Sequence, residues 1–274
     1  MTPRLAGIAA VTFDFGNTLV PVTTPALRRV VELTAEAVCE RWPELNRDVF
    51  LRAWAEERER QFREEVPQFR EVDLAERLVR VFARLRGMAP PSPEERWDQS
   101  HAAAFSDPTD VDWGVEQYSR AFVDGLPESP GVTDLLARLA AERVVAILSN
   151  WPLAATIDRY AEAHGWLPSL AAIVVSQRVG TIKPHPAIFE AARVAIGSPE
   201  PGSILHVGDD WAADVVGARD AGWRAAWVRT RPAESPLPSS EPDGTAGPDL
   251  ELWELAELEP MLGPAPAVGT ARAR

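Results

Sequence analysis

The spacing of hydrophobic positions changes twice along this chain. Residues 8–14 form a short apolar run that lies between glycines and ends at Asp14, which is typical of a buried β-strand. Between about residues 25 and 125, apolar residues recur every three or four positions among many Arg and Glu, which predicts amphipathic helices and no strand. We expect these helices at residues 25–41, 47–65, 72–87, 93–105 and 114–125.

Beyond residue 129, short apolar runs alternate with helical patterns. Parallel strands that are covered by helices on both faces have this sequence signature. A segment rich in Pro, Ser, Glu and Gly, residues 231–248, is expected to be a mobile loop, and residues 250–262 a last strand and short helix. The other expected strands are residues 144–148, 172–175, 203–207 and 224–228, and the expected helices are residues 131–141, 153–164, 186–196 and 211–221.

Together these patterns predict an α/β protein. Because residues 8–14 are a strand of the same apolar kind, the helical block is an insertion after the first strand of the sheet. The expected fold is a doubly wound parallel-sheet (Rossmann-like) core with an inserted all-helical cap domain that closes over the sheet edge. The expected boundaries are residues 1–20 and 129–262 for the core, 21–128 for the cap, and 263–274 for a flexible tail.

The charge and cysteine content of the chain limit the binding partners and the covalent cross-links that we expect. The net charge of −13 argues against nucleic acid or an anionic membrane surface, although a local pocket can still bind a small anion. A single cysteine, Cys39, excludes an internal disulfide. The first residues lack a signal-peptide pattern and no apolar run approaches membrane-spanning length, so we expect a cytoplasmic protein.

Polar residues follow the predicted strands at their carboxyl ends, where open parallel sheets bind ligands. Asp14 ends the first strand, Ser149 and Asn150 follow another, and Asp209 follows a third. Lys183 lies on a loop before a helix, and it is the only lysine among the 28 basic Lys and Arg residues of the chain. A compact ammonium differs from an arginine fork in geometry, so its retention here indicates a specific role.

These groups suit phosphoryl transfer. Asp14 is a candidate nucleophile that would form an aspartyl phosphate. Mg²⁺ held by Asp14 and Asp209 would bring this anionic nucleophile together with an anionic substrate. Ser149, the backbone N–H of Asn150 and Lys183 would then bind the phosphoryl oxygens.

Four ordered motifs extend this hypothesis to a family. They are F-D-F-G-N-T-L (13–19), L-S-N (148–150), K-P-H-P (183–186) and V-G-D-D-W-A-A-D (207–214). In this order, and at these strand and loop positions, the chain resembles the haloacid dehalogenase superfamily of hydrolases, in the branch whose helical cap follows the first motif. The resemblance covers nearly the whole chain.

The resemblance implies a role for each matching residue. Asp14 matches the nucleophile, Ser149 the phosphate-binding Ser/Thr, and Lys183 the cation of the third motif. Asp209 matches the magnesium-binding acid, Asp214 has the spacing of the second acid of the fourth motif, and Asp210 is a further supporting carboxylate. Thr18 matches the turn threonine of the first motif and is placed with Ser149, Asn150 and Lys183 among the phosphate-binding residues. The metal ligands would be Asp14, Asp209 and the backbone carbonyl of Gly16.

Gly16 departs from the pattern. Phosphatases of this superfamily carry a second Asp at this position, which protonates the leaving group and later activates water. Its loss removes a general acid/base that typically contributes roughly 10²–10⁴ in rate. We therefore keep three functions open: a Mg²⁺-dependent phosphatase of small phosphorylated metabolites with altered proton handling, a phosphate- or partner-binding pseudoenzyme, and a dehalogenase-type C–X hydrolase.

Two aromatic residues near the motifs have simpler interpretations. His206 lies within a strand, so we interpret it as a packing histidine. Trp151 follows Asn150 directly, and lining the pocket mouth and packing in the core are equally open to it.

Overall fold

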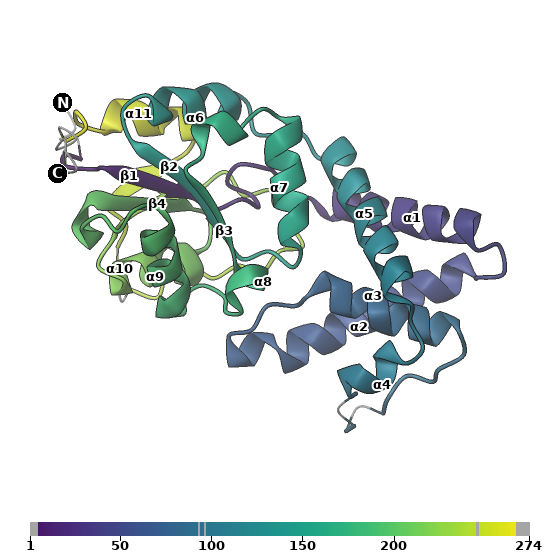
Figure 1. The fold of residues 1–274 in the computed structure, drawn as a ribbon. Helices are drawn as coiled ribbons and strands as arrows, with labels where there is room; N and C mark the ends of the chain where they lie inside the picture. The colour runs from purple at the N-terminus through teal and green to yellow at the C-terminus, as the bar shows by residue number, and fades with distance from the viewer. Residues whose placement is uncertain (1–4, 93, 96, 245–246, 267–274) are drawn as a thin grey trace, which may run out of the picture.

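The computed structural model describes residues 5–92, 94–95, 97–244 and 247–266, and its centre is a six-stranded parallel sheet (Figure 1). The strand order is β3-β2-β1-β4-β5-β6, and each neighbouring pair is parallel. In this order the direction of winding reverses between β1 and β4, which is where doubly wound sheets bind ligands. The predicted fold class is therefore confirmed. The strands are β1 (Ala10–Phe13), β2 (Val144–Ser149), β3 (Ala172–Val175), β4 (Ile204–Gly208), β5 (Arg224–Val228) and β6 (Leu250–Leu252).

Helices cover both faces of the sheet. Val11 and Phe13 of β1 point into one apolar cluster with α6 (Val132–Ala140) and α7 (Ala154–Ala163). Ala10 of β1 belongs to a second cluster on the opposite face, with α9 (Pro186–Ala195) and α10 (Gly217–Asp220). Alternate residues of the central strand are buried on opposite faces of the sheet, and the one polar side chain within the strand, Thr12, is fully buried as well.

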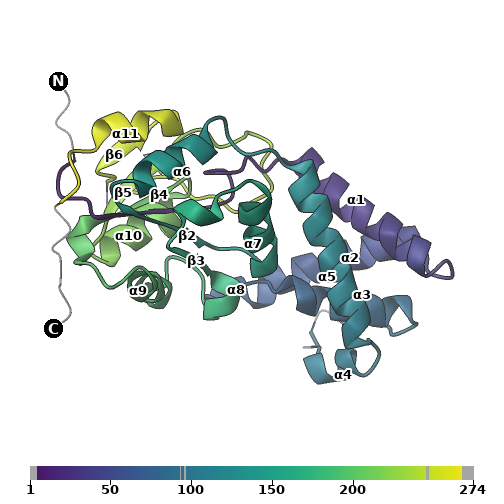
Figure 2. The same ribbon diagram turned by 45° about the horizontal axis from the view of Figure 1, so that its top comes forward.

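The helices between β1 and α6 lie together to one side of the sheet (Figure 2). Each of the five helices starts after a polar residue whose side chain accepts a backbone N–H of the first turn: Thr23, Asn46, Asp73, Asp98 and Asp107. No strand occurs among the described residues of this segment, as predicted. Its division from the sheet as a cap domain stays a prediction. These helices are α1 (Thr24–Arg41), α2 (Arg47–Glu64), α3 (Leu74–Leu85), α4 (Gln99–Ala103) and α5 (Pro108–Gly125), with the 3₁₀ turn η1 (Val66–Gln68) between α2 and α3.

Three predicted helices differ from the observed ones. The helix expected at 93–105 is only α4, because Asp98 caps its start; residues 93 and 96 lie outside the described residues. The helix expected at 114–125 begins earlier, at Pro108, since a proline at the first helical position follows the cap of Asp107. The helix expected at 211–221 begins as a π-helix, η4 (Trp211–Val216), and continues as α10.

The predicted loop at 231–248 also needs correction. Its first part, residues 231–240, which we call the strap, packs against the carboxyl edge of the sheet. Glu234 O accepts the backbone N–H of Thr24, and Ser235 bonds to the side chain of Asn17. After the strap come β6 and the short helix α11 (Leu258–Met261), as expected.

The first and last described segments of the chain lie side by side. Leu5 and Leu262 form an isolated bridge, and the N–H of Gly263 donates to Leu5 O, so the predicted flexible tail is anchored at its first residue. Residues 267–274 of that tail lie outside the described residues. Over the part of the chain that is described, we find no helix with the length and apolar character needed to cross a membrane.

Candidate active site

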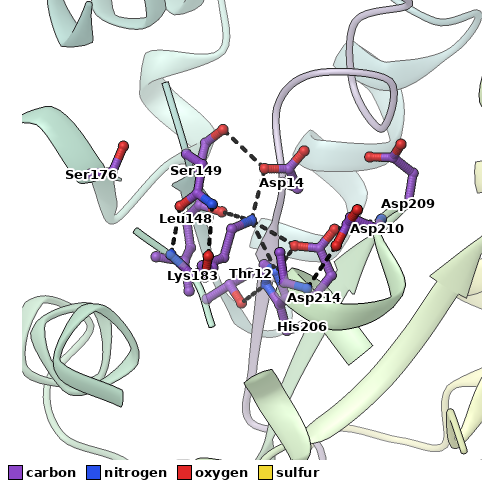
Figure 3. Close-up of polar contacts among 12 residues, drawn as sticks. Thr12, Asp14, Leu148, Ser149, Ser176, Lys183, His206, Asp209, Asp210 and Asp214 are labelled. Carbon is purple, nitrogen blue, oxygen red and sulfur yellow. Dashed lines mark hydrogen bonds and ion pairs between the residues drawn. The ribbon is translucent and has the colours of Figure 1, made fainter. Parts of the chain in front are cut away.

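Asp14 lies at the end of β1, in the sheet position predicted for it. Its backbone N–H donates to Val207 O of the neighbouring β4, which fixes the carboxylate at the reversal point of the sheet. Its Oδ1 accepts hydrogen bonds from Ser149 Oγ at 2.9 Å and from Lys183 Nζ at 2.8 Å (Figure 3). One carboxylate oxygen is thus occupied by protein donors, and the side chain is oriented before any ligand binds.

Lys183 sits at the centre of a buried charge cluster. Its Nζ donates to Asp14 Oδ1, to Asp214 Oδ1 at 2.6 Å and to Leu148 O at 2.9 Å, while only 2% of the residue is exposed. Burial alone would lower the pKa of Lys183, but the two carboxylates outweigh it and hold the pKa above its usual range. Lys183 is therefore a permanent cation between two acids.

The carboxylate of Asp214 has two further contacts besides Lys183. His206 Nε2 lies 3.0 Å from Asp214 Oδ1, and the backbone N–H of Asp210 donates to Oδ2. Burial and the neighbouring Lys183 lower the pKa of His206, so the ring is neutral and its Nε2–H donates to Asp214 while Nδ1 accepts the hydroxyl of Thr12 at 2.8 Å. Burial raises the pKa of Asp214, but Lys183 and His206 together leave it well below its usual range.

Gly208 makes room for this carboxylate. A Cβ on Gly208 would lie 2.2 Å from Asp214 Cγ, so any side chain here would displace Asp214. The glycine of the V-G-D-D motif is thus needed for close packing beneath the acid.

Asp209 faces Asp14 from the end of β4. Its Oδ2 accepts a hydrogen bond from Arg231 Nη1 of the strap at 2.8 Å. Burial and the charges of Asp14 and Asp214 raise the pKa of Asp209 to about 8, although Arg231 opposes this shift. Burial likewise raises the pKa of Asp14 to about 6, with Lys183 opposing. Protons are therefore held tightly by this edge of the sheet.

The same geometry fits a hard divalent cation. Asp14, Asp209 and Asp214 each offer an oxygen, and these oxygens lie within 4.8 Å of one another. Carboxylate oxygens are the ligands that Mg²⁺ prefers, and a cation would relieve the repulsion that raises the pKa values of Asp14 and Asp209. The donor set therefore suits magnesium. Gly16 lines the same cavity, although its carbonyl as a ligand stays a prediction.

The space beside Gly16 is filled by apolar side chains. A Cβ on Gly16 would lie 2.6 Å from Leu237 Cδ1 of the strap and 3.1 Å from Trp151 Cζ3. Trp151 therefore has both of the interpretations left open above: it packs edge-on against Phe15 and it lines the cavity. A side chain at the position that carries an acid in the resembling phosphatases would therefore require the tip of the Leu237 side chain to move.

A cavity of about 370 Å³ extends from this cluster to the helices α2, α3 and α5. Asp14, Lys183 and Asp209 line its base. Its opposite wall consists of helix side chains, among them Phe62, Arg77 and Tyr118. The cavity thus connects the polar cluster with the inserted helical segment.

The other predicted phosphate ligands differ in their exposure. Thr18 is fully buried and does not line the cavity, and its hydroxyl has no hydrogen-bond partner among the described residues, so a phosphate contact from its side chain stays a prediction. Ser149 is also fully buried and outside the cavity lining, and its hydroxyl donates to Asp14 instead. Asn150 lines the cavity. Its side-chain amide donates to Lys183 O and accepts the backbone N–H of Lys183.

Asp210 has a structural role. Its Oδ1 accepts the N–H of Ala213 and so caps η4, and both of its oxygens bond to Ser240 of the strap. The supporting role predicted for it is therefore to hold the strap and the π-helix in place.

Sequence reasoning missed two parts of the site. The first is the hydrogen-bonded chain from Thr12 through His206 to Asp214; a signal existed, because Thr12 and His206 are polar residues inside otherwise apolar strands, and the two are register partners. The second is the strap, with Arg231 and Leu237. Its composition resembles an ordinary loop, and no local pattern indicates that it folds back over the sheet edge.

Comparison with known proteins agrees with this geometry. The sequence profile of the hydrolase family described as haloacid dehalogenase-like hydrolase matches residues 8–222. Pyrimidine 5′-nucleotidase YjjG of Escherichia coli (strain K12) is 29% identical over 148 residues, which are 53% of this chain and 62% of that protein. The chain thus matches less than two thirds of that relative's length.

Two solved structures share the fold. The 2-haloacid dehalogenase from Pseudomonas syringae pv. Tomato DC3000 is 22% identical with a TM-score of 0.65, over 93% of this chain and 97% of that one. The HAD-hydrolase YfnB from Bacillus subtilis, bound to magnesium, is 19% identical with a TM-score of 0.57, over 94% of this chain and 99% of that one. Since the family profile also covers most of the sequence, the chain belongs to the haloacid dehalogenase-like hydrolases.

Proposed function

We propose that this hydrolase is a Mg²⁺-dependent phosphatase that acts through an aspartyl phosphate at Asp14 on a small phosphorylated metabolite. The observation that carries the proposal is the cluster of Asp14, Asp209 and Asp214, whose facing oxygens lie within 4.8 Å of one another. Lys183 and Arg231 supply two positive charges for these three buried acids, so a bound divalent cation, as in a metal-dependent phosphatase, would complete the charge balance. Magnesium, when bound, neutralises charge on the nucleophile and on the phosphoryl group.

Side chains of the protein orient the nucleophile Asp14 and stabilise the charge on it. Ser149 and Lys183 hold one oxygen of Asp14, which leaves the other oxygen to attack phosphorus in line with the leaving group. Lys183 keeps its proton throughout, so it stabilises charge and does not act as a base. The phosphoryl group moves from the ester oxygen to Asp14, and water then cleaves the acyl phosphate to free phosphate and the carboxylate.

The acid that protonates the leaving group in the resembling phosphatases is missing two residues after Asp14. Gly16 carries no acid, and Asn17 does not titrate in the useful range. The enzyme should therefore favour aryl or acyl phosphates, whose leaving groups depart without a proton, over alkyl phosphates. The similarity to a pyrimidine 5′-nucleotidase supports phosphate-ester chemistry without fixing the ester.

A second function is favoured by the covered position at Gly16. Dehalogenases of the superfamily also lack the second acid, so C–halogen hydrolysis at Asp14 is the alternative. The test is a panel of phosphate esters and 2-haloacids, assayed for phosphate and halide release with magnesium and with a chelator. Phosphate release that requires magnesium and is lost in Asp14→Asn supports the phosphatase; halide release that survives the chelator supports the alternative. Absence of both products would indicate a binding role.

A further inference from the structure

One buried arginine in the cavity has no acidic partner. Arg77 of α3 is 4% exposed and lines the cavity. Its Nε donates to Gln61 Oε1 at 2.8 Å, and its guanidinium lies 5.1 Å from the ring centre of Trp54. Among the residues that the structure describes, no carboxylate lies within ion-pair distance of Arg77 and its two terminal nitrogens have no hydrogen-bond partner.

Arg60, Arg80 and Arg84 of α2 and α3 each have an acidic partner, although Nη1 and Nη2 of Arg60 also lack a hydrogen bond. Arg60 pairs with Glu64 at 2.9 Å, and Arg80 and Arg84 both reach Glu57, at 3.9 and 3.3 Å. Buried charges are normally paired in this way because an unpaired one is costly. Arg77, which faces the cavity, has no such acidic partner, so its guanidinium is open to a ligand.

A second guanidinium faces the same space. Arg58 of α2 lines the cavity, stacks over Phe62 at 4.7 Å, and donates to Pro236 O of the strap at 3.4 Å. Arg58 and burial both lower the pKa of Arg77, burial more strongly, to about 10. Two like charges held together on one wall destabilise each other until an anion lies between them.

The nearest acid does not satisfy these cations. Glu71 lines the cavity and acts on Arg77 at longer range, but its oxygens accept hydrogen bonds from Ser176 Oγ and from its neighbour's backbone N–H at Val72. Asp73 also faces Arg77 at longer range, and it caps α3 and bonds to Gln177. Tyr118 of α5 adds a hydroxyl to the same wall.

We propose that Arg77, supported by Arg58, is a specificity-determining subsite that binds a second oxyanion, a carboxylate or a phosphate, at the end of the substrate remote from Asp14. The site rests on the proposed phosphatase function. A guanidinium offers two parallel N–H donors, which match either oxyanion. The apolar walls between the two ends, which include Phe62, Phe69 and Trp151, suit the hydrocarbon part of such a molecule.

The test measures binding and needs no turnover. Calorimetry with magnesium present compares alkylphosphonates of increasing length with ω-phosphonoalkanoic acids and α,ω-bisphosphonates of the same lengths. At the matching length, the wild-type protein should bind one doubly anionic series roughly 10- to 100-fold more tightly than the alkylphosphonate, since a charged hydrogen bond contributes that much. The series that gains more identifies carboxylate or phosphate as the second group.

Variants assign the effect to the residue. Arg77→Gln should abolish the preference and leave alkylphosphonate affinity unchanged, and Arg77→Lys should keep part of it. Arg80→Gln is the matched control, because it removes a buried arginine of the same helix that has an acidic partner; its preference should equal that of wild type. Equal affinity of wild type for the three series, or a preference retained in Arg77→Gln, overturns the subsite. Failure of every phosphonate to bind contradicts the proposed function itself, and the subsite with it.

Discussion

Leu237 Cδ1 lies 2.6 Å from the point that a Cβ on Gly16 would occupy. The strap thus fills the place where the resembling phosphatases carry their second acid. Gly16 has no left-handed φ, so the obstacle to a side chain is this contact and not the backbone conformation. The strap can pack this closely against residue 16 because that residue is a glycine.

Restoring the acid should therefore require two changes. We expect Gly16→Asp alone to gain little, and Gly16→Asp with Leu237→Ala to raise kcat/KM for alkyl phosphates, relative to aryl phosphates, by up to roughly 10²-fold. The matched control is Gly16→Asn with Leu237→Ala, which has the same size without a titrating group. An equal gain in that control would show that space, and not proton transfer, limits the enzyme.

Arg231 of the strap would compete with Mg²⁺ for the carboxylate of Asp209. Arg231 donates to Asp209 Oδ2, and a guanidinium beside a bound dication is unfavourable, so Arg231→Ala should increase Mg²⁺ affinity. The measurement is calorimetry with Mg²⁺ alone. Arg229→Ala is the control, since Arg229 stacks on Trp227 and Trp253 and pairs with Glu251 instead of a metal-site acid. Weaker binding in Arg231→Ala would mean that Arg231 orients Asp209 for the metal.

Lys183 should dominate the stability of the metal-free protein. Lys183→Met leaves Asp14 and Asp214 buried without their shared cation, so we expect the free energy of unfolding to fall by about 3–5 kcal/mol. Urea denaturation in chelator measures this. Arg178→Gln, which breaks an exposed ion pair with Asp158, should cost less than about 1 kcal/mol. Similar losses in the two variants would contradict the central position of Lys183.

Mg²⁺ should stabilise the protein more as the pH rises. Burial raises the pKa of Asp14 to about 6 and of Asp209 to about 8, so the folded metal-free protein binds these protons more tightly than the unfolded chain does. Its stability therefore falls as pH increases through this range, and the metal, which replaces the protons, restores it. The lowered pKa of Asp214 acts only at more acidic pH.

The measurement is the increase in Tm on adding Mg²⁺, below pH 6 and above pH 8, the range set by the two acids. The increase should be larger at the higher pH in wild type and should lose most of this dependence in Asp209→Asn. A Tm increase that does not change with pH would show that the metal does not displace these protons.

The sequence predicted the sheet and its polar edge because both depend on local patterns. Asp14, Lys183 and Asp209 follow apolar runs or precede a helix, and the carboxyl ends of parallel strands must meet. The partners of Lys183 could be identified only from the fold. Asp214 is six residues beyond the end of β4, and the π-helix η4 brings it back to Lys183.

Other features had no local signal. In the sequence, Arg77 is one of many charged residues on an Arg- and Glu-rich helix. Only the packing of α2, α3 and α5 shows that it faces the cavity without an acidic partner. The contact of Leu237 with Gly16 joins residues far apart in the chain, so no periodicity could indicate it.

Detection of a phosphoryl group on Asp14 tests the proposed function most directly. An aryl phosphate needs no leaving-group proton, whereas hydrolysis of the acyl phosphate needs a base that Gly16 does not supply, so the intermediate should accumulate. The measurement is mass spectrometry of the enzyme after an acid quench during turnover with Mg²⁺ and an aryl phosphate. The account predicts one phosphoryl group on the peptide that contains Asp14, and none in Asp14→Asn. Release of the phenol without any phosphoryl group on that peptide would contradict it.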